Sequence, residues 1–89
     1  MDPHVYISTS PYCQAVQRNL LEVGVSLRLT GVRDGVACLV IQQVGQLDYL
    51  YSEEELLQRA SAVCREVPFE TYVEVLPARR KDIALKDQN

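Results

Sequence analysis

The most reactive side chains of this 89-residue chain are three cysteines and one histidine. Cys13, Cys38 and Cys64 are widely and almost evenly spaced, which matches no zinc-binding or redox pair. Their odd number also argues against the disulfide framework of a small secreted domain. We therefore expect all three to be small buried hydrophobes. His4 lies near the start of the sequence without a positioned nucleophile or base, and we predict no catalytic residue.

Other polar groups suggest binding rather than catalysis. Ser8, Thr9 and Ser10 precede a predicted helix, where backbone N–H groups can bind an anion, although helix capping already explains Ser10. Together with Arg28, these three residues are our candidate ligand-binding residues. The glutamates of the segment 53–55 have no His or Cys partner at metal-ligand spacing, so we predict neither a metal site nor a cofactor.

Charge and hydropathy exclude several classes of partner. The formal net charge is −3, which argues against the non-specific binding of nucleic acid that clustered Lys and Arg provide. No apolar run approaches the roughly 20 residues of a spanning helix, and the first residues lack the pattern of a signal peptide. We expect a cytoplasmic protein that contacts neither nucleic acid nor membrane.

The segment Val25–Val44 predicts a β-hairpin that positions the rest of the chain. Two strand-like runs meet at Asp34-Gly35, a dipeptide that tolerates the positive φ angles of a type I′ turn. A regular register from that turn places Leu27 and Leu29 on the face toward the helices, with Cys38 and Val40. Because the second strand is apolar on both faces, we expect it at the centre of the sheet.

The remaining elements follow from periodicity and capping signals. We predict a strand at Val5–Thr9, a helix at Pro11–Val23, a helix at Glu53–Glu66 and a strand at Phe69–Leu76. Ser52 and Glu55 have the spacing of a capping box, and alternation along the last strand turns Glu70, Tyr72 and Glu74 to its outward face. The segment Leu47–Tyr51 fits an extension of the second hairpin strand, a short separate strand or a connection, and its pattern does not distinguish them. The chain is a single domain over residues 1–89, with an ordered core at about 4–77 and a polar tail at 78–89.

This order predicts an α+β, ferredoxin-like βαββαβ fold, an antiparallel sheet with two helices on one face. The other face would then be uncovered and would carry an apolar patch that marks an interface. The predicted interface residues are Tyr6, Ala37, Leu39, Ile41 and Tyr72. We expect a homodimer that uses this open face or an edge strand.

Two family resemblances accompany this pattern. The turn at Gly24-Val25, the strand 35–41 and the ending Phe69–Pro77 resemble ACT-type regulatory domains, which implies binding of an amino acid or similar small molecule between paired domains. The segment Ser10-Pro11-Tyr12-Cys13 is similar to the active site of glutaredoxins. That second likeness is incidental, because Ser10 stands where the family has its nucleophilic cysteine and a hydroxyl cannot replace a thiolate.

These observations predict a small non-catalytic binding domain that binds itself, a protein partner or a small ligand. The alternatives are a small dimeric ferredoxin-like enzyme with a pocket between sheet and helices, and a degenerate glutaredoxin-like redox protein. An RNA-recognition module with this fold is disfavoured, because Leu39 and Ile41 stand where stacking aromatics are needed.

Overall fold

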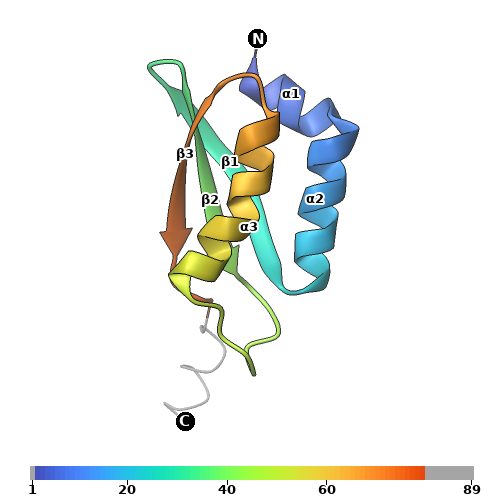
Figure 1. Ribbon diagram of the computed structural model, residues 1–89, viewed down its shortest axis with the longest axis vertical. Coiled ribbons are helices and arrows are strands. Elements are labelled where there is room, and N and C mark those ends of the chain that lie inside the picture. The colour runs from blue at the N-terminus through green and yellow to red at the C-terminus, as the bar shows by residue number, and fades with distance from the viewer. Residues whose placement is uncertain (1, 80–89) are drawn as a thin grey trace.

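The computed structural model describes residues 2–79 and has three helices and three strands in this part of the chain (Figure 1). Most of the predicted polar tail lies outside the described residues. In chain order the elements are α1 (Pro3–Thr9), α2 (Pro11–Glu22), β1 (Val25–Arg33), β2 (Val36–Gln43), α3 (Glu53–Glu66) and β3 (Glu70–Leu76).

The first element is a helix, so the predicted strand at Val5–Thr9 was wrong. Asp2 is the N-cap of α1 and accepts a hydrogen bond from the backbone N–H of His4, and Pro3 occupies the first turn. The same cap-then-proline signal recurs at Ser10-Pro11, where it starts α2. The β-branched residues of this short run therefore did not decide its conformation, because the capping residues on both sides favour helices.

Helices α2 and α3 confirm their predictions. Ser10 caps α2 through its side-chain oxygen, which accepts from the backbone N–H of Cys13. Ser52 and Glu55 form the predicted capping box at the start of α3. In that box the Ser52 hydroxyl accepts from the Glu55 N–H at 3.1 Å, and the Glu55 carboxylate accepts from the Ser52 N–H at 2.9 Å.

The hairpin turn is confirmed, but its register contains a bulge. Asp34 and Gly35 have φ angles of 52° and 80°, and Arg33 pairs with Val36. Further from the turn the register shifts between Leu29 and Gly31, which leaves Thr30 as an extra residue of β1. A shift of one residue exchanges the faces of the residues beyond it. The predicted position of Leu27 and Leu29 toward the helices is confirmed, whereas that of Cys38 and Val40 was wrong.

The sheet has three strands in the order β1-β2-β3, which contradicts the ferredoxin-like fold. Strands β1 and β2 are antiparallel, whereas β2 and β3 are parallel and are joined through α3. Because the first segment is helical, no strand separates the hairpin from the last strand, and β3 takes the place beside β2. The predicted central position of the strand at 36–43 is confirmed.

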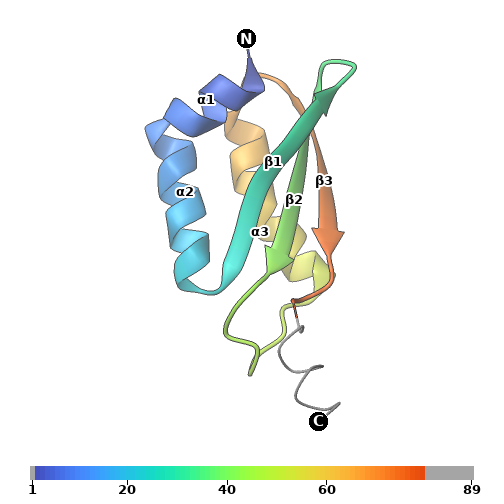
Figure 2. The ribbon, with the colours of Figure 1, turned by 180° about the vertical axis from the view of Figure 1, so that it is seen from behind.

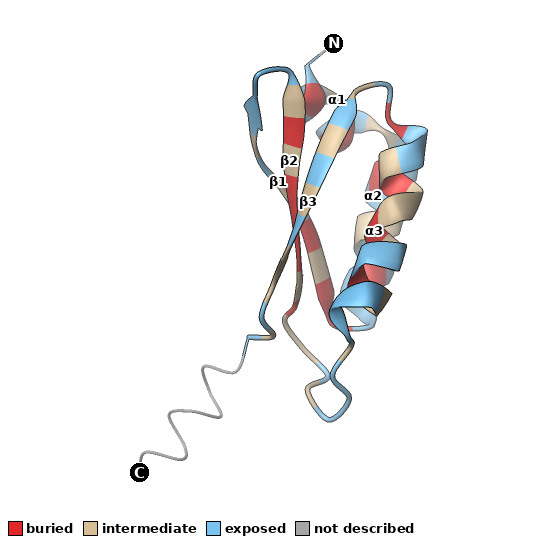
Figure 3. Ribbon diagram, turned by 60° about the vertical axis from the view of Figure 1, so that its left-hand side comes forward, coloured by how far each residue is buried: buried red, intermediate tan, exposed pale blue. Residues whose placement is uncertain are grey.

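All three helices lie on one face of the sheet, so the molecule has two layers (Figures 1 and 2). Figure 3 shows the sheet on one side and helices α2 and α3 on the other, with buried residues in red along both the strands and the helices. The core joins Val25, Leu27, Leu39 and Ile41 of the sheet to residues of the helices that include Ile7, Cys13, Leu20, Leu56, Ala60 and Val63. Among residues 2–79 no helix lies on the opposite face of the sheet, which is called the open face below.

The helices of the described region include none that is both long and apolar enough to cross a lipid bilayer.

Candidate functional site

The predicted anion-binding hydroxyls are used locally by the helices that carry them. The Ser8 and Thr9 hydroxyls donate to the carbonyl oxygen of Val5 at 3.1 and 2.6 Å, and Ser10 caps α2. Ser8 and Thr9 also lie at the C-terminal end of α1, where the helix dipole disfavours an anion. These hydrogen bonds indicate a local structural role for Ser8 and Thr9 within α1, and helix capping for Ser10.

Arg28 is not brought together with those hydroxyls. It lies on β1 between Leu27 and Leu29, which pack in the core region beneath the helices. Because neighbouring residues of a strand point to opposite faces, the exposed Arg28 side chain stands on the open face. The predicted ligand set is therefore divided between the two layers of the molecule.

Four of the five predicted interface residues lie in or against the core. Ala37, Leu39 and Ile41 are at most 2% exposed and belong to the face beneath the helices. Tyr6 lies on α1 and packs edge-on against Phe69, with ring centroids 5.6 Å apart. Only Tyr72 is on the open face, where it is 62% exposed. The expected placement of Leu39 and Ile41 was wrong because of the bulge at Thr30.

The open face is built from rungs, each made of three residues directly opposite one another on β1, β2 and β3. The strand registers define four of them, which are Arg33–Val36–Glu70, Gly31–Cys38–Tyr72, Arg28–Val40–Glu74 and Ser26–Gln42–Leu76. The predicted outward direction of Glu70, Tyr72 and Glu74 agrees with this arrangement. Small and apolar residues of β2 thus run down the middle of the open face.

Charge is separated across the open face. Its β1 side carries Arg28 and Arg33, and its β3 side carries Glu70 and Glu74. Each arginine shares a rung with a glutamate, but the two stand on opposite sides of β2, roughly 9 to 10 Å apart across two strand spacings. The face therefore has a positive row and a negative row at the same heights along the strands.

The centre of the open face is a groove of about 650 Å³. Its lining includes Val36, Cys38 and Val40 on the floor, with Arg33 on one side and Tyr72 on the other. Val40 is only 6% exposed although it lies on the face without helices. An apolar floor between two charged rows is the pattern of a protein-interaction surface, where a desolvated centre is surrounded by a polar rim.

Gly31 leaves a gap in the positive row. A Cβ atom built on Gly31 would meet no other atom within 4 Å, so the space above this residue is empty. The gap shares a rung with Tyr72, the most exposed large hydrophobic residue among residues 2–79. The central rung thus combines a large projecting ring with an open space on the opposite side of Cys38.

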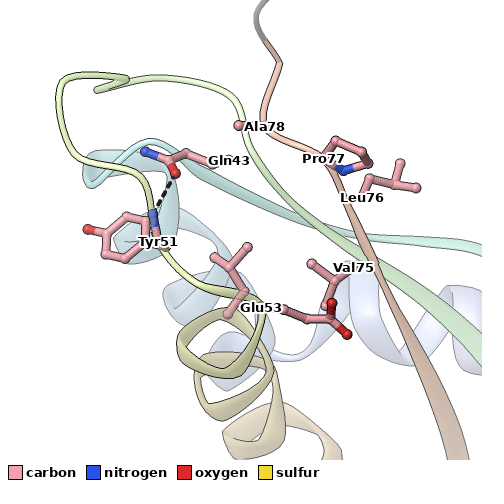
Figure 4. Close-up of a pocket in the computed structure, with 8 residues that line it drawn as sticks. Gln43, Tyr51, Glu53, Val75, Leu76, Pro77 and Ala78 are labelled. Atoms are coloured by element: carbon pink, nitrogen blue, oxygen red, sulfur yellow. Dashed lines mark hydrogen bonds between the residues drawn. The ribbon is translucent and has the colours of Figure 1, made fainter.

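A second hollow, of about 240 Å³, lies where β2 and β3 end beside the start of α3 (Figure 4). Its most buried polar group, the Gln43 amide, is occupied by the loop that follows β2. Gln43 Oε1 accepts from the Tyr51 N–H at 3.0 Å, and Nε2 lies within 2.6 to 3.2 Å of three loop carbonyl oxygens. Glu53 and Tyr51 are the titratable residues in the described lining.

Two titratable groups, Tyr49 in the loop before α3 and Glu55 in its first turn, have shifted pKa values. The Tyr49 hydroxyl donates to the Glu55 carboxylate at 3.2 Å, which raises the pKa of Tyr49. The pKa of Glu55 is lowered, chiefly by the hydrogen bond from the Ser52 backbone N–H and also by the Tyr49 hydroxyl. Arg59 lies over the Tyr51 ring at 4.5 Å from its centroid. These contacts attach the loop to α3, so the two pKa shifts have a structural explanation.

The described part of the chain has no candidate metal site. Across residues 2–79, no group of three or more His, Cys, Asp or Glu side chains could hold a metal ion.

The chain matches no protein-family model, no curated protein and no solved structure.

Sequence reasoning missed the open face because it missed the bulge. The available signal was Thr30-Gly31, since an isolated glycine in a strand pattern often marks a bulge. A bulge at that point brings Leu27 and Leu29 onto the same face as Leu39 and Ile41. The remaining strand positions then form the charged rows and the groove floor.

Proposed function

We propose that this chain is a non-catalytic interaction domain that forms a homodimer through the open face of its sheet. The observation that carries the proposal is the separation of charge on that face. A positive row on β1 and a negative row on β3 flank an apolar floor, so the face is complementary to a second copy of itself.

The composition of the face supports a protein partner of this kind. Tyr72 supplies an exposed aromatic ring, and arginine and tyrosine are the residues that most often anchor interfaces. The floor residue Val36, which is half-buried in the single chain, would gain from the exclusion of water. Four charges of two signs would form the rim, where they set the orientation of the partner more than its affinity.

The face is favoured over the edge strands as the place of contact. The β1 edge is interrupted by the bulge at Thr30, a feature that hinders pairing with another strand. The β3 edge carries two glutamates and is followed by Pro77, which has no N–H to donate. Both edges therefore have features that natural sheets use to prevent strand addition.

The size of the face sets the expected strength of the dimer. Four rungs of a three-stranded sheet cover roughly 400 Å² of projected area per copy, from strand spacings of about 4.8 Å and rises of about 3.4 Å per residue. Stable dimers commonly bury about 800 Å² per partner, so we expect a weak dimer that dissociates on dilution.

Sedimentation velocity over a wide range of concentration tests the proposal. We expect the weight-average mass to rise from that of one chain toward that of two as the concentration increases to about 1 mM. At that concentration even a dimer with a binding free energy of about −4 kcal/mol contains roughly half of the chains. A mass of one chain at every concentration would overturn the proposal.

A matched pair of variants assigns the contact to the open face. Tyr72→Ala removes the exposed ring from this face and should weaken the dimer about ten-fold. Leu21→Ala removes an equally exposed side chain from α2 in the helical layer and should leave the dimer unchanged. The proposal fails if Tyr72→Ala dimerises like the parent chain or if Leu21→Ala is the variant that loses the dimer.

A further inference from the structure

We infer that the two-fold axis of this dimer runs parallel to β2, above Cys38, and that Tyr72 of each copy enters the gap over Gly31 of the other. The inference rests on the proposed dimer and adds its geometry and its specificity-determining residues. It follows from the registers of the three strands, because these registers determine which residues of the two copies each possible axis would place opposite one another.

Packed sheets restrict the choice of axis. Two facing sheets related by a two-fold axis have that axis in the plane between them, and aligned packing keeps their strands within about 30° of one another. The axis is therefore close to parallel or close to perpendicular to the strands. The parallel axis places β1 of one copy over β3 of the other, whereas the perpendicular axis places each edge strand over its own equivalent.

Charge separates these two arrangements. With the parallel axis each rung lies over the same rung reversed, so Arg28 faces Glu74 of the second copy and Arg33 faces Glu70. Each of these pairs occurs twice by symmetry. With the perpendicular axis above Cys38, Arg28 faces Arg33 of the second copy and Glu70 faces Glu74, which places like charges together.

Shape supports the same choice on the central rung. The parallel axis places the Tyr72 ring over the empty space at Gly31 of the second copy, where no atom lies within 4 Å of the position of a Cβ. The perpendicular axis opposes Tyr72 to Tyr72 and leaves two glycines facing each other. The projecting ring and the gap are thus complementary in the first arrangement alone.

A single charge reversal distinguishes the axes by the sign of its effect. Arg28→Glu would face Glu74 of the second copy across a parallel axis, and we expect the dissociation constant to rise about ten-fold. Adding Glu74→Arg in the same chain should restore the dimer. Across a perpendicular axis Arg28→Glu would instead face Arg33, so a tighter dimer would overturn the inference and leave the proposed dimer standing.

Mixed cross-linking measures the pairing directly. Two variants are made in a Cys38→Ala, Cys64→Ala background, one with Gly31→Cys and one with Tyr72→Cys, while Cys13 is retained because it is 1% exposed. A short bismaleimide should join the two variants when they are mixed and should join neither variant to itself. The mixed dimer still contains one intact Tyr72–Gly31 pair. Cross-linking of each variant to itself, with no cross-link between the two different variants in the mixture, would show the perpendicular axis.

Filling the gap tests the role of Gly31. Gly31→Phe has room to fold, since nothing occupies the space, but its ring would take the place of Tyr72 of the second copy. We expect it to be monomeric with an unfolding transition like that of the parent chain. Val32→Phe adds the same ring on the other face and should dimerise. A Gly31→Phe chain that dimerises like its parent would contradict the inference, whereas a parent chain that is monomeric would overturn the proposed function itself.

Discussion

Leu29 lies directly opposite Leu39, and the next paired residue toward the turn is Gly31, opposite Cys38. The extra residue between them, Thr30, lets a two-residue turn coexist with a single apolar face. If Thr30 took a paired place in the ladder instead, Leu29 would lie opposite Val40. The bulge therefore decides which face of the hairpin packs against the helices and which face is open.

Deleting Thr30 should be tolerated. The shortened strand keeps the pairs on both sides of the bulge, since Leu29 stays opposite Leu39 and Gly31 stays opposite Cys38. We expect a loss of less than about 1 kcal/mol in the free energy of unfolding by urea, similar to that of Thr30→Ala, which loses the hydrogen bond from the Thr30 hydroxyl to the Cys38 carbonyl. A loss of at least about 3 kcal/mol on deletion, comparable to that for a large core truncation, would show that the strand needs the extra residue.

Gln43 should stabilise the loop that follows β2 through its side-chain amide. The amide is 1% exposed and serves the Tyr51 N–H and three loop carbonyls, so Gln43→Met leaves these groups without their partner. We expect a loss of about 2 to 3 kcal/mol in unfolding free energy and faster hydrogen exchange at the Tyr51 amide. Gln42→Met, on the open face, should lose less than about 1 kcal/mol. If the two variants are equally stable, the loop does not depend on Gln43.

Three glycines should respond differently to alanine. Gly24 has a φ of +80°, and its Cβ would lie 2.5 Å from the backbone oxygen of Gly45, so Gly24→Ala should lose about 2 to 4 kcal/mol. Gly35 has the same φ in open space, and Gly35→Ala should lose about 1 to 2 kcal/mol from backbone strain alone. Gly31→Ala has neither problem and should be neutral or stabilising. Urea unfolding of the three variants measures this order, and a Gly24→Ala chain as stable as Gly31→Ala would contradict it.

Local chemistry made part of the fold predictable from sequence. The capping box at Ser52, the cap at Ser10-Pro11 and the turn at Asp34-Gly35 each depend on a few neighbouring residues, and each is confirmed. The first helix was also marked locally, by Asp2-Pro3, but the β-branched residues of the same run predicted a strand.

The candidate site was less predictable because it depends on pairing between distant strands. The outward row Glu70, Tyr72 and Glu74 follows from alternation within one strand, and it agrees with the structure. Which residues stand beside that row depends on the parallel pairing of β2 with β3 and on the bulge at Thr30. Alternation within one strand specifies neither the partner of a strand nor a one-residue shift in register.

Glu55 should make the stability of α3 depend on pH. Its pKa is lowered by the Ser52 backbone N–H and the Tyr49 hydroxyl, so its contribution is present above the pKa of the unfolded chain and is lost as pH falls through the lower folded pKa. NMR titration of the carboxyl carbon should give a pKa below that of a free glutamate, and Tyr49→Phe should move it part of the way back. Glu55→Gln keeps a capping oxygen but does not titrate, so the stability difference between it and the parent chain should shrink in acid. A difference that stays constant from neutral pH into the acid range would show that the capping carboxylate titrates alike in the folded and unfolded chains.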